Sequence, residues 1–559
     1  MKKIQKVSML VFGMLALYSC TNLNEVILDE YNAAGLTDKQ AAEGAIVPVY
    51  AILPTLYQHT VHFALNEIST DEAILPYRGG TDWGDNGIYL SLHKHETTST
   101  DPNVKNHWNA TLIGISRAVT AIQSLQVSKD PAAPLYLAEA RGMRAFYNML
   151  MLDMFGVAFS KEDLGDVSAI LRGDKAVEYI KSELVAIEPT LGTSTGPGRL
   201  TKGAVWGLLA RLHLNAAAYR DIYASSLTFK AEDLDKVIEY TDKIINSGQY
   251  SLSPDYWAIF GNANHDNKEL IFAIDQRAEL NGHNRMAYFS LANDQRPLPA
   301  YPAANGTDGP AITSDFYRSW VGLYKDVDPA DADPRFYKQN IKPTDECIAE
   351  ADYNIDRGIL RGQQYGLQYS GGAFLKCPDG KFKVGKIYNT RKAAPYPAVI
   401  HTELVDFSTA GSDYSTGFRV EKYEFSKKSQ SGRNYGEADI SIVRLADVYL
   451  MRAEAKLRKS NDVAGALADV NKVRTARTSN KPAGSSLSTI DLDALLRERG
   501  FELYWEMHRR TDLIRFGKYE SAWTEKSNTD KNKRIFPIPQ TAIDGASNLP
   551  GYLKQNPGY

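Results

Sequence analysis

Apolar residues recur at helical spacing in paired segments along much of the chain, and this pattern limits the fold more than any other feature. One stripe runs from Leu445 to Ala453, and beyond the polar turn at 460–462 an answering stripe runs from Ala466 to Val473. Such a pair has about the length of one tetratricopeptide unit, with alanines where two helices must approach closely. Similar pairs occur earlier in the chain, so the sequence predicts a mostly α fold built on a tetratricopeptide-like helical-repeat scaffold.

The character of the sequence changes between residues 250 and 437. This segment is rich in Gly, Pro, Asn, Asp and Tyr, and strand-like pieces such as 269–274 are embedded in it. Irregular segments of this length are often functional, so we expect a large loop-rich insertion with short helices and a few short strands. The predicted divisions are a lipoprotein signal peptide at 1–19, a lipid-anchored tether at 20–35, an N-terminal helical-repeat part at 36–249 with a ligand-loop region at 66–105, the insertion at 250–437, and a C-terminal helical-repeat part with a tail at 438–559. We expect residues 36–559 to form one compact unit.

The N-terminus carries the features of an export signal. Lysines at positions 2, 3 and 6 precede an apolar run at 7–17 that is too short to span a bilayer. Cys20 follows a small residue at the end of this run and resembles the acylated cysteine of a bacterial lipobox. We therefore expect a protein anchored to a membrane through a lipid on Cys20, with an ordinary secreted protein as the alternative. The formal charge of −3 offers no basic surface for nucleic acid.

Cys347 and Cys377 are the other two cysteines of the chain. In an exported protein they can pair in only one way, but a sequence does not give the distance between them. A disulfide and two free thiols therefore both stay open.

The segment 496–513 concentrates arginine and carboxylate side chains, which suits either a catalytic site or a structural ion-pair network. Read as one helix, it places Glu502 and Glu506 on one face with a third glutamate one turn earlier. Arginines stand three residues from both, at Arg499 and Arg509, and such spacings bring opposite charges together on a helix. No histidine lies at a zinc-binding spacing from the glutamates, and no nucleophile elbow or phosphate-binding loop occurs between a strand and a helix. We expect ion pairs between packed helices and no catalytic residues.

A site for sugar rings needs an exposed aromatic side chain for the apolar C–H face and polar groups for the hydroxyls. The loop at 71–86 combines aromatic, charged and amide side chains, and the insertion adds further aromatic residues. The candidate binding residues from these two regions are Asp71, Arg78, Trp83, Asn86, Tyr301 and Trp320. Core packing is the alternative role for each aromatic residue.

Several motifs near the C-terminus, together with the lipobox, resemble those of the SusD/RagB family of outer-membrane lipoproteins. The matching segments are 444–455, 471–477, 498–513, 535–539 and 555–559. They cover the end of the chain and leave the middle third, where such proteins vary, without a match.

The resemblance implies a non-catalytic, cell-surface protein that binds a glycan and sits on the outer membrane through the lipid on Cys20. It also implies a SusC-like TonB-dependent transporter as partner, and it places Asp71, Arg78 and Trp83 in the ligand-loop region of the family. No cofactor is implied, although a structural calcium ion stays open because Asp and Asn are plentiful in the loops. The alternatives are a helical-repeat interaction lid for a non-glycan nutrient and, less favoured, a glycoside hydrolase.

Overall fold

The structure is a computed structural model that describes residues 36–559 apart from 79–86, 164, 194–195, 281–283, 288, 406–412, 414–415 and 428–435. The predicted signal peptide, the tether and Cys20 lie outside the described residues. The described part is mostly helical with few short strands, which confirms the predicted fold class. None of its helices is long and apolar enough to cross a membrane.

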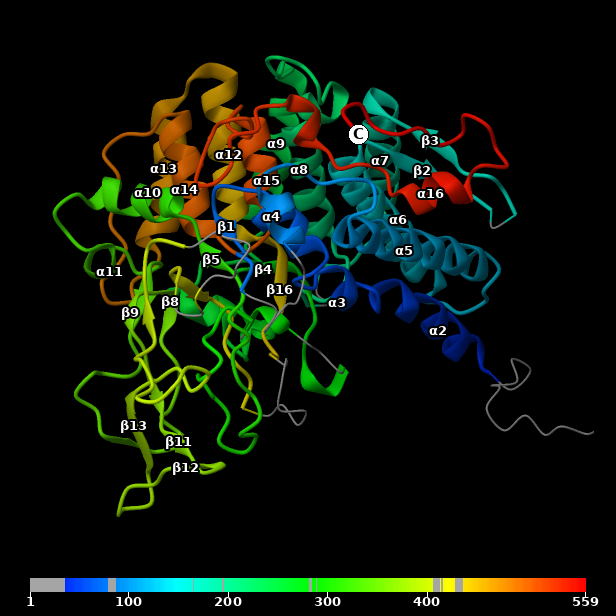
Figure 1. Ribbon diagram of the computed structural model, residues 1–559. Coiled ribbons are helices and arrows are strands. Elements are labelled where there is room, and N and C mark those ends of the chain that lie inside the picture. The colour runs from blue at the N-terminus through cyan, green and yellow to red at the C-terminus, as the bar shows by residue number, and fades with distance from the viewer. Residues whose placement is uncertain are drawn as a thin grey trace, which may run out of the picture.

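Consecutive helices pack against one another to form the body of the protein (Figure 1). Local signals set their ends: the Asp101 carboxylate accepts the N–H groups of Asn103 and Val104 at the start of α5, and Gly156 with φ of 67° ends α6. The elements of this body are α5 (Pro102–Gln126), α6 (Ala133–Phe155), the hairpin of β2 (Ala158–Ser160) and β3 (Ala169–Leu171), α7 (Gly173–Ile187), η3 (Glu188–Thr190), α8 (Lys202–Arg220), α9 (Ala231–Asn246), α12 (Leu445–Ser460), α13 (Val463–Thr475) and α14 (Leu492–Leu503).

One pair of antiparallel strands connects the insertion to the helical body. Helices α9 and α12 pack directly against each other although the whole insertion separates them in sequence. Strand β4 (Leu270–Ile274), in the first part of the insertion, pairs antiparallel with β16 (Ile440–Arg444), which directly follows the insertion. Gly207 of α8 permits the close approach of this ladder, because a Cβ there would lie 2.6 Å from Cγ1 of Val443. The stack of helices therefore continues across the insertion.

Two predicted helices of the C-terminal part are shorter than expected. Residues 440–444 form strand β16, since their β-branched side chains extend the ladder with β4 before α12 begins. The second charged helix also stops early, because α14 ends at Leu503 and α15 (Arg509–Arg515) starts a separate element. The turn between them includes Trp505 and Met507, both with φ of 62°.

The N-terminal segment and the C-terminal tail pack against the helical body. The N-terminal segment contains α2 (Asp38–Tyr50), α3 (Leu53–Leu56), the π-helix η2 (Ala64–Ile68), β1 (Ala73–Ile74) and α4 (Ile88–His93). The tail adds η8 (Lys531–Arg534) and α16 (Gln540–Gly545), and the Asn556 amide donates to the carbonyls of Phe155 and Phe536. The motif at 555–559 thus fastens the tail to the end of α6.

The insertion consists of short helices and short strands around a second, smaller core. Next to the body lie η4 (Trp257–Phe260), η5 (Asn264–Asp266), η6 (Ala278–Leu280), η7 (Arg285–Ala287), β5 (Ala311–Ile312), α10 (Ser314–Tyr324), α11 (Pro329–Ala332), β6 (Tyr337–Lys338), β8 (Arg357–Leu360) and β15 (Arg419–Glu421). The remaining strands, residues 345–401 apart from β8, are called the β lobe below: β7 (Cys347–Ile348), β9 (Gly362–Gln363), β10 (Tyr365–Leu367), β11 (Tyr369–Ser370), β12 (Ala373–Phe374), β13 (Phe382–Lys386) and β14 (Ile400–His401). In Figure 1 the part with β11, β12 and β13 projects away from the helices.

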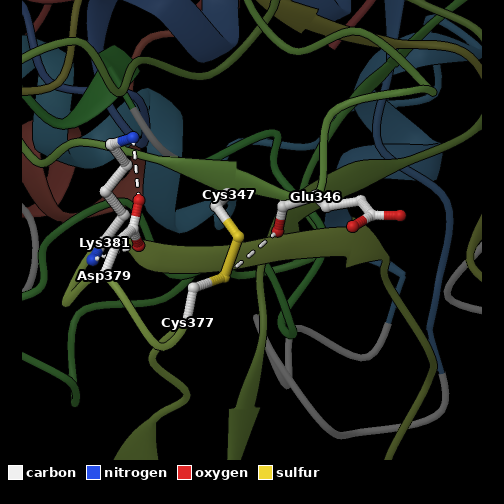
Figure 2. Close-up of a disulfide and its surroundings, with 5 residues drawn as sticks. All are labelled: Glu346, Cys347, Cys377, Asp379 and Lys381. Atoms are coloured by element: carbon white, nitrogen blue, oxygen red, sulfur yellow. Dashed lines mark hydrogen bonds and ion pairs between the residues drawn. A yellow bond between two sulfur atoms is a disulfide. The ribbon is translucent and has the colours of Figure 1, made fainter.

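Cys347 and Cys377 form a disulfide in the β lobe (Figure 2). It joins β7 to the turn before β13, and these two strands also pair with each other. On the chain-entropy model, closing a loop with a sequence separation of 30 stabilises the fold by about 3–4 kcal/mol. The pairing that the sequence left open is thus present, and it strengthens a region with little core of its own.

Candidate functional site

A buried network of ten charged side chains lies where the helical body meets the insertion. Its cations are Arg335, Lys422, Arg444, Arg474 and Arg477, and its carboxylates are Glu269, Asp333, Glu498, Glu502 and Glu506. Arg444 is central, with Nη1 2.7 Å from Glu269 and 2.8 Å from Glu502, and Nε 2.7 Å from Glu506. Five positive and five negative groups balance one another, so the network needs no ligand for neutrality.

The arginines of this network keep Glu502 and Glu506 ionised. Burial alone would raise the pKa of Glu502, but Arg477, Arg444 and Arg335 outweigh it and hold the pKa well below its usual range. Arg444 and Lys422 likewise lower the pKa of Glu506 against the effect of burial. A general acid in a glycoside hydrolase needs the opposite shift. The expectation of ion pairs between packed elements is therefore confirmed.

The individual ion pairs differ from those expected along one helix. Arg499 contacts Asp512 at 2.7 Å and Asp447 at 3.0 Å, and Arg509 contacts Asp71 at 2.7 Å. The helix spacing predicted Arg499 with Glu502, and Glu506 with Arg509 or Arg510. In the structure these arginines pair with other residues, because the helix ends at Leu503 and Glu506 lies in the turn before α15.

A second pair of buried carboxyl groups, Glu67 and Glu72, supports this turn. Glu72 accepts the N–H of Trp505 at 2.7 Å, and Glu67 accepts the N–H of Met507. Burial raises the pKa of Glu72 to about 7, even though the Trp505 N–H and the charge of Arg509 lower it. Burial, and then the neighbouring charge of Glu72, raise the pKa of Glu67 well above its usual range. The pair therefore holds at least one proton at neutral pH.

We expect Glu72→Gln to remove part of the pH dependence of stability. The raised pKa of Glu72 gives stability that is fully present below pH ~4.5 and is lost as the pH rises through about 7. A glutamine keeps an oxygen for the Trp505 N–H and does not ionise, so the loss, on the order of 3 kcal/mol, should disappear. Urea unfolding at several pH values between about 5 and 8 measures the free energy of unfolding of the wild type and of Glu72→Gln. If this free energy falls equally with pH in the two proteins, Glu72 is not the group responsible.

The two loop regions predicted to bind ligand meet in the structure. Strand β1 pairs antiparallel with β5, with Ala73 opposite Ile312. The guanidinium of Arg78 donates to the carbonyls of Gly309, Asp413 and Thr416. We call this region, residues 71–78 with 305–313, the β1–β5 junction. It brings Asp71 and Arg78 to the start of the insertion.

The geometry gives Asp71 and Arg78 positioning roles within the junction. Both carboxylate oxygens of Asp71 accept from Arg509 at 2.7 Å, which ties the loop to α15. Arg78 is buried and donates hydrogen bonds to backbone carbonyls of neighbouring loops. Trp83 and Asn86, the other two candidates from this loop, lie outside the described residues. Their proposed role in binding stays a prediction.

Trp320 does not form an exposed aromatic surface, and this expectation is wrong. Its side chain is 0% exposed, and its ring stacks on Phe501 with centroids 3.6 Å apart. The sequence contains a pattern that indicates burial of Trp320. Phe316 and Trp320 stand four residues apart in α10, which begins after the N-cap Thr313, and they form the buried stripe of that helix. Trp320 joins the insertion to α14 instead of facing solvent.

Tyr301 lies half-buried in the loop before β5 and packs against the smaller core. Sequence reasoning missed the residue that shapes this loop, Asp308, which is buried with φ of 53°. Its carboxylate accepts from the N–H of Asn293 at 3.0 Å and from Arg391 at 2.9 Å. The run Asn-Gly-Thr-Asp-Gly that ends at Gly309 is a turn signal that could have located it.

Two groups of potential metal-binding side chains occur among the described residues. Cys347, Cys377 and Asp379 form the first, but its two sulfur atoms are bonded to each other. The second consists of His265, Asp275 and Asp439. In this group His265 contacts Asp439 at 2.7 Å, and Asp275 forms an ion pair with Arg277 at 2.7 Å. Neither is the all-oxygen set that calcium prefers, so these groups do not support the open calcium prediction.

A family model described as the SusD family matches residues 268–559, just over half of the chain. The chain belongs to the SusD family. It is 26% identical to the starch-binding protein SusD of Bacteroides thetaiotaomicron over 521 residues, which covers 89% of this chain and 85% of that protein. Among solved structures, the surface glycan-binding protein A of Bacteroides fluxus covers 93% of this chain and 99% of its own at 17% identity, with a TM-score of 0.63.

A third relative is the surface glycan-binding protein A of Bacteroides thetaiotaomicron, solved in complex with laminarihexaose. It aligns with 92% of this chain and 98% of its own length at 19% identity, with a TM-score of 0.62. At these identities the structural matches establish the fold. The SusD family membership and the fold, both expected from the C-terminal motifs, are thus confirmed.

Proposed function

We propose that this SusD-family protein is a non-catalytic glycan-binding lipoprotein of the outer membrane. In this role it captures an oligosaccharide or polysaccharide at the cell exterior and delivers it to a SusC-like TonB-dependent transporter. The observation that carries the proposal is the match to a starch-binding protein along 89% of the chain. The lipid on Cys20 holds the protein to the membrane.

The electrostatics of the charged residues support binding without catalysis. Glu502 and Glu506 have depressed pKa values, and each buried glutamate of the ten-residue network has two or more cationic or backbone partners, so these glutamates are structural. Glu67 and Glu72 carry raised pKa values, but they hold the backbone of the turn at Trp505 and Met507. Both are buried, with exposed fractions of 0% for Glu67 and 1% for Glu72.

Native gel electrophoresis through immobilised polysaccharides tests the glycan-binding role. Protein covering residues 36–559 should migrate more slowly in gels with at least one of starch, laminarin, xylan and mannan than in a gel without polysaccharide. Folded protein that none of a broad glycan panel retards would overturn the proposal and favour a lid for another nutrient. Delivery has its own test: the full-length protein should co-purify from native membranes with a TonB-dependent transporter.

A further inference from the structure

The β lobe carries an open groove that lies apart from the β1–β5 junction. It has a volume of about 640 Å³, which is of the size that small-molecule sites have. Its walls come from the loop at 294–296, from β11, and from the chain between β13 and β14. The charged and tyrosine side chains that line it are Asp294, Arg296, Tyr369, Lys386, Tyr388 and Tyr396.

Tyr388 and Tyr396 are the most unusual aromatic residues of the described chain. Their side chains are 44% and 49% exposed, and no other described phenylalanine, tyrosine or tryptophan is exposed by more than about a third. A pair of large exposed rings that line one groove marks a contact surface better than scattered apolar residues do.

The backbone places both rings on one face of the groove. Tyr388 lies opposite Ala398 in an antiparallel bridge, and Asn389 donates its N–H to the carbonyl of Pro397 at 2.8 Å. Alternate residues of paired strands point to the same side, so Tyr396, two residues before Ala398, shares a face with Tyr388. The two rings therefore form neighbouring aromatic surfaces.

Polar groups stand beside these rings. Asp294 accepts the hydroxyl of Thr390 at 2.5 Å, which fastens the chain after β13 to the opposite wall. The guanidinium of Arg296 stacks over the ring of Tyr369 at 4.5 Å and donates to the carbonyl of Pro302 at 2.7 Å. Lys386 is exposed at the end of β13. Aromatic faces flanked by a carboxylate, a guanidinium and an ammonium group suit a ligand with apolar faces and hydroxyl edges.

We propose that this groove of the β lobe binds pyranose rings of the captured glycan. The C–H faces of the sugars lie against Tyr388 and Tyr396, and their hydroxyls lie against Asp294, Arg296 and Lys386. This proposal rests on the proposed function, because it assigns the same ligand class. The groove is joined to the β1–β5 junction through Arg391, which donates to Asp308 at 2.9 Å. The groove therefore lies beside the junction, and the disulfide at Cys347 supports the lobe that carries it.

Calorimetric titration with maltohexaose and laminarihexaose tests the groove, using whichever the wild-type protein binds. The double variant Tyr388→Ala/Tyr396→Ala should bind at least tenfold more weakly, because it loses both aromatic surfaces. The double variant Tyr388→Phe/Tyr396→Phe keeps the rings and should bind within about threefold of the wild type. Leu375→Ala, which changes another exposed side chain of the same lobe, should leave affinity unchanged.

The outcomes separate the two proposals. If the wild type binds and the double alanine variant, with an unchanged unfolding midpoint, binds equally well, the groove proposal is overturned and the proposed function stands. If the folded wild type binds neither hexasaccharide nor any polysaccharide of the gel panel, both proposals fall. If it binds only polysaccharide, the same variants are compared in the gel with that polysaccharide, and the same tenfold criterion applies.

Discussion

Replacing Arg444 by methionine should destabilise the protein by about 3–5 kcal/mol, although it removes no contact with solvent or ligand. Arg444 is 0% exposed and holds Glu269, Glu502 and Glu506 at 2.7–2.8 Å. Methionine fills much of the same volume, so the cost comes from three buried carboxylates that lose a cation rather than from a cavity. Urea unfolding followed by circular dichroism at pH 7 measures the change.

Arg318→Met is the matched control for this substitution. Arg318 pairs with Glu403 at 2.7 Å, but its side chain is 68% exposed, so the same change should cost less than about 1 kcal/mol. Adding Glu506→Gln to Arg444→Met should recover part of the loss, because it restores a balance of four cations and four carboxylates while its amide oxygen can still accept from Lys422. If Arg444→Met costs no more than Arg318→Met, the network is not what holds the insertion to the helical body.

Trp320→Ala should cost about 3–5 kcal/mol of stability while leaving glycan affinity unchanged. Trp320 is fully buried, stacks on Phe501 and meets the edge of Phe336 with centroids 5.2 Å apart. Its removal leaves a cavity between α10 and α14, far larger than the neighbouring rings can fill by small shifts. Urea unfolding gives the stability change, and calorimetry well below the unfolding midpoint gives the affinity.

Trp320→Phe is the control for the size of the cavity and should lose less stability than Trp320→Ala. A tenfold loss of glycan affinity in Trp320→Ala without a loss of stability would contradict the structural role. It would return Trp320 to the set of residues that contact ligand.

The sequence was informative where structure depends on local spacing. The stripes from Leu445 and from Ala466 predicted the packed pair α12 and α13, and the apolar run at 269–274 predicted β4. Spacing alone does not show that residues 440–444 form a strand that pairs with β4. This strand runs directly into α12, and it forms because its pairing partner lies far away in the chain. The same limit applies to Arg444, whose partner Glu269 lies 175 residues earlier.

The candidate binding residues show this limit more clearly. The sequence predicts Asp71 and Arg78 as ligand contacts, whereas in the structure Asp71 binds Arg509 and Arg78 binds backbone carbonyls. The sequence does not single out Tyr388 and Tyr396, because only the register with Ala398 puts them on one face. An irregular segment carries no periodicity that reveals such a register, whereas the helical stripe of Phe316 and Trp320 was readable.

We infer that a charged, buried scaffold supports a surface that binds glycan without cleaving it. The most direct test is calorimetric titration of the protein with the polysaccharide that retards it most in native gels, followed by an assay for new reducing ends in the same sample. The account predicts saturable binding and no increase in reducing ends after prolonged incubation. Reducing ends released by pure protein, or no heat of binding with any glycan of the panel, would contradict it.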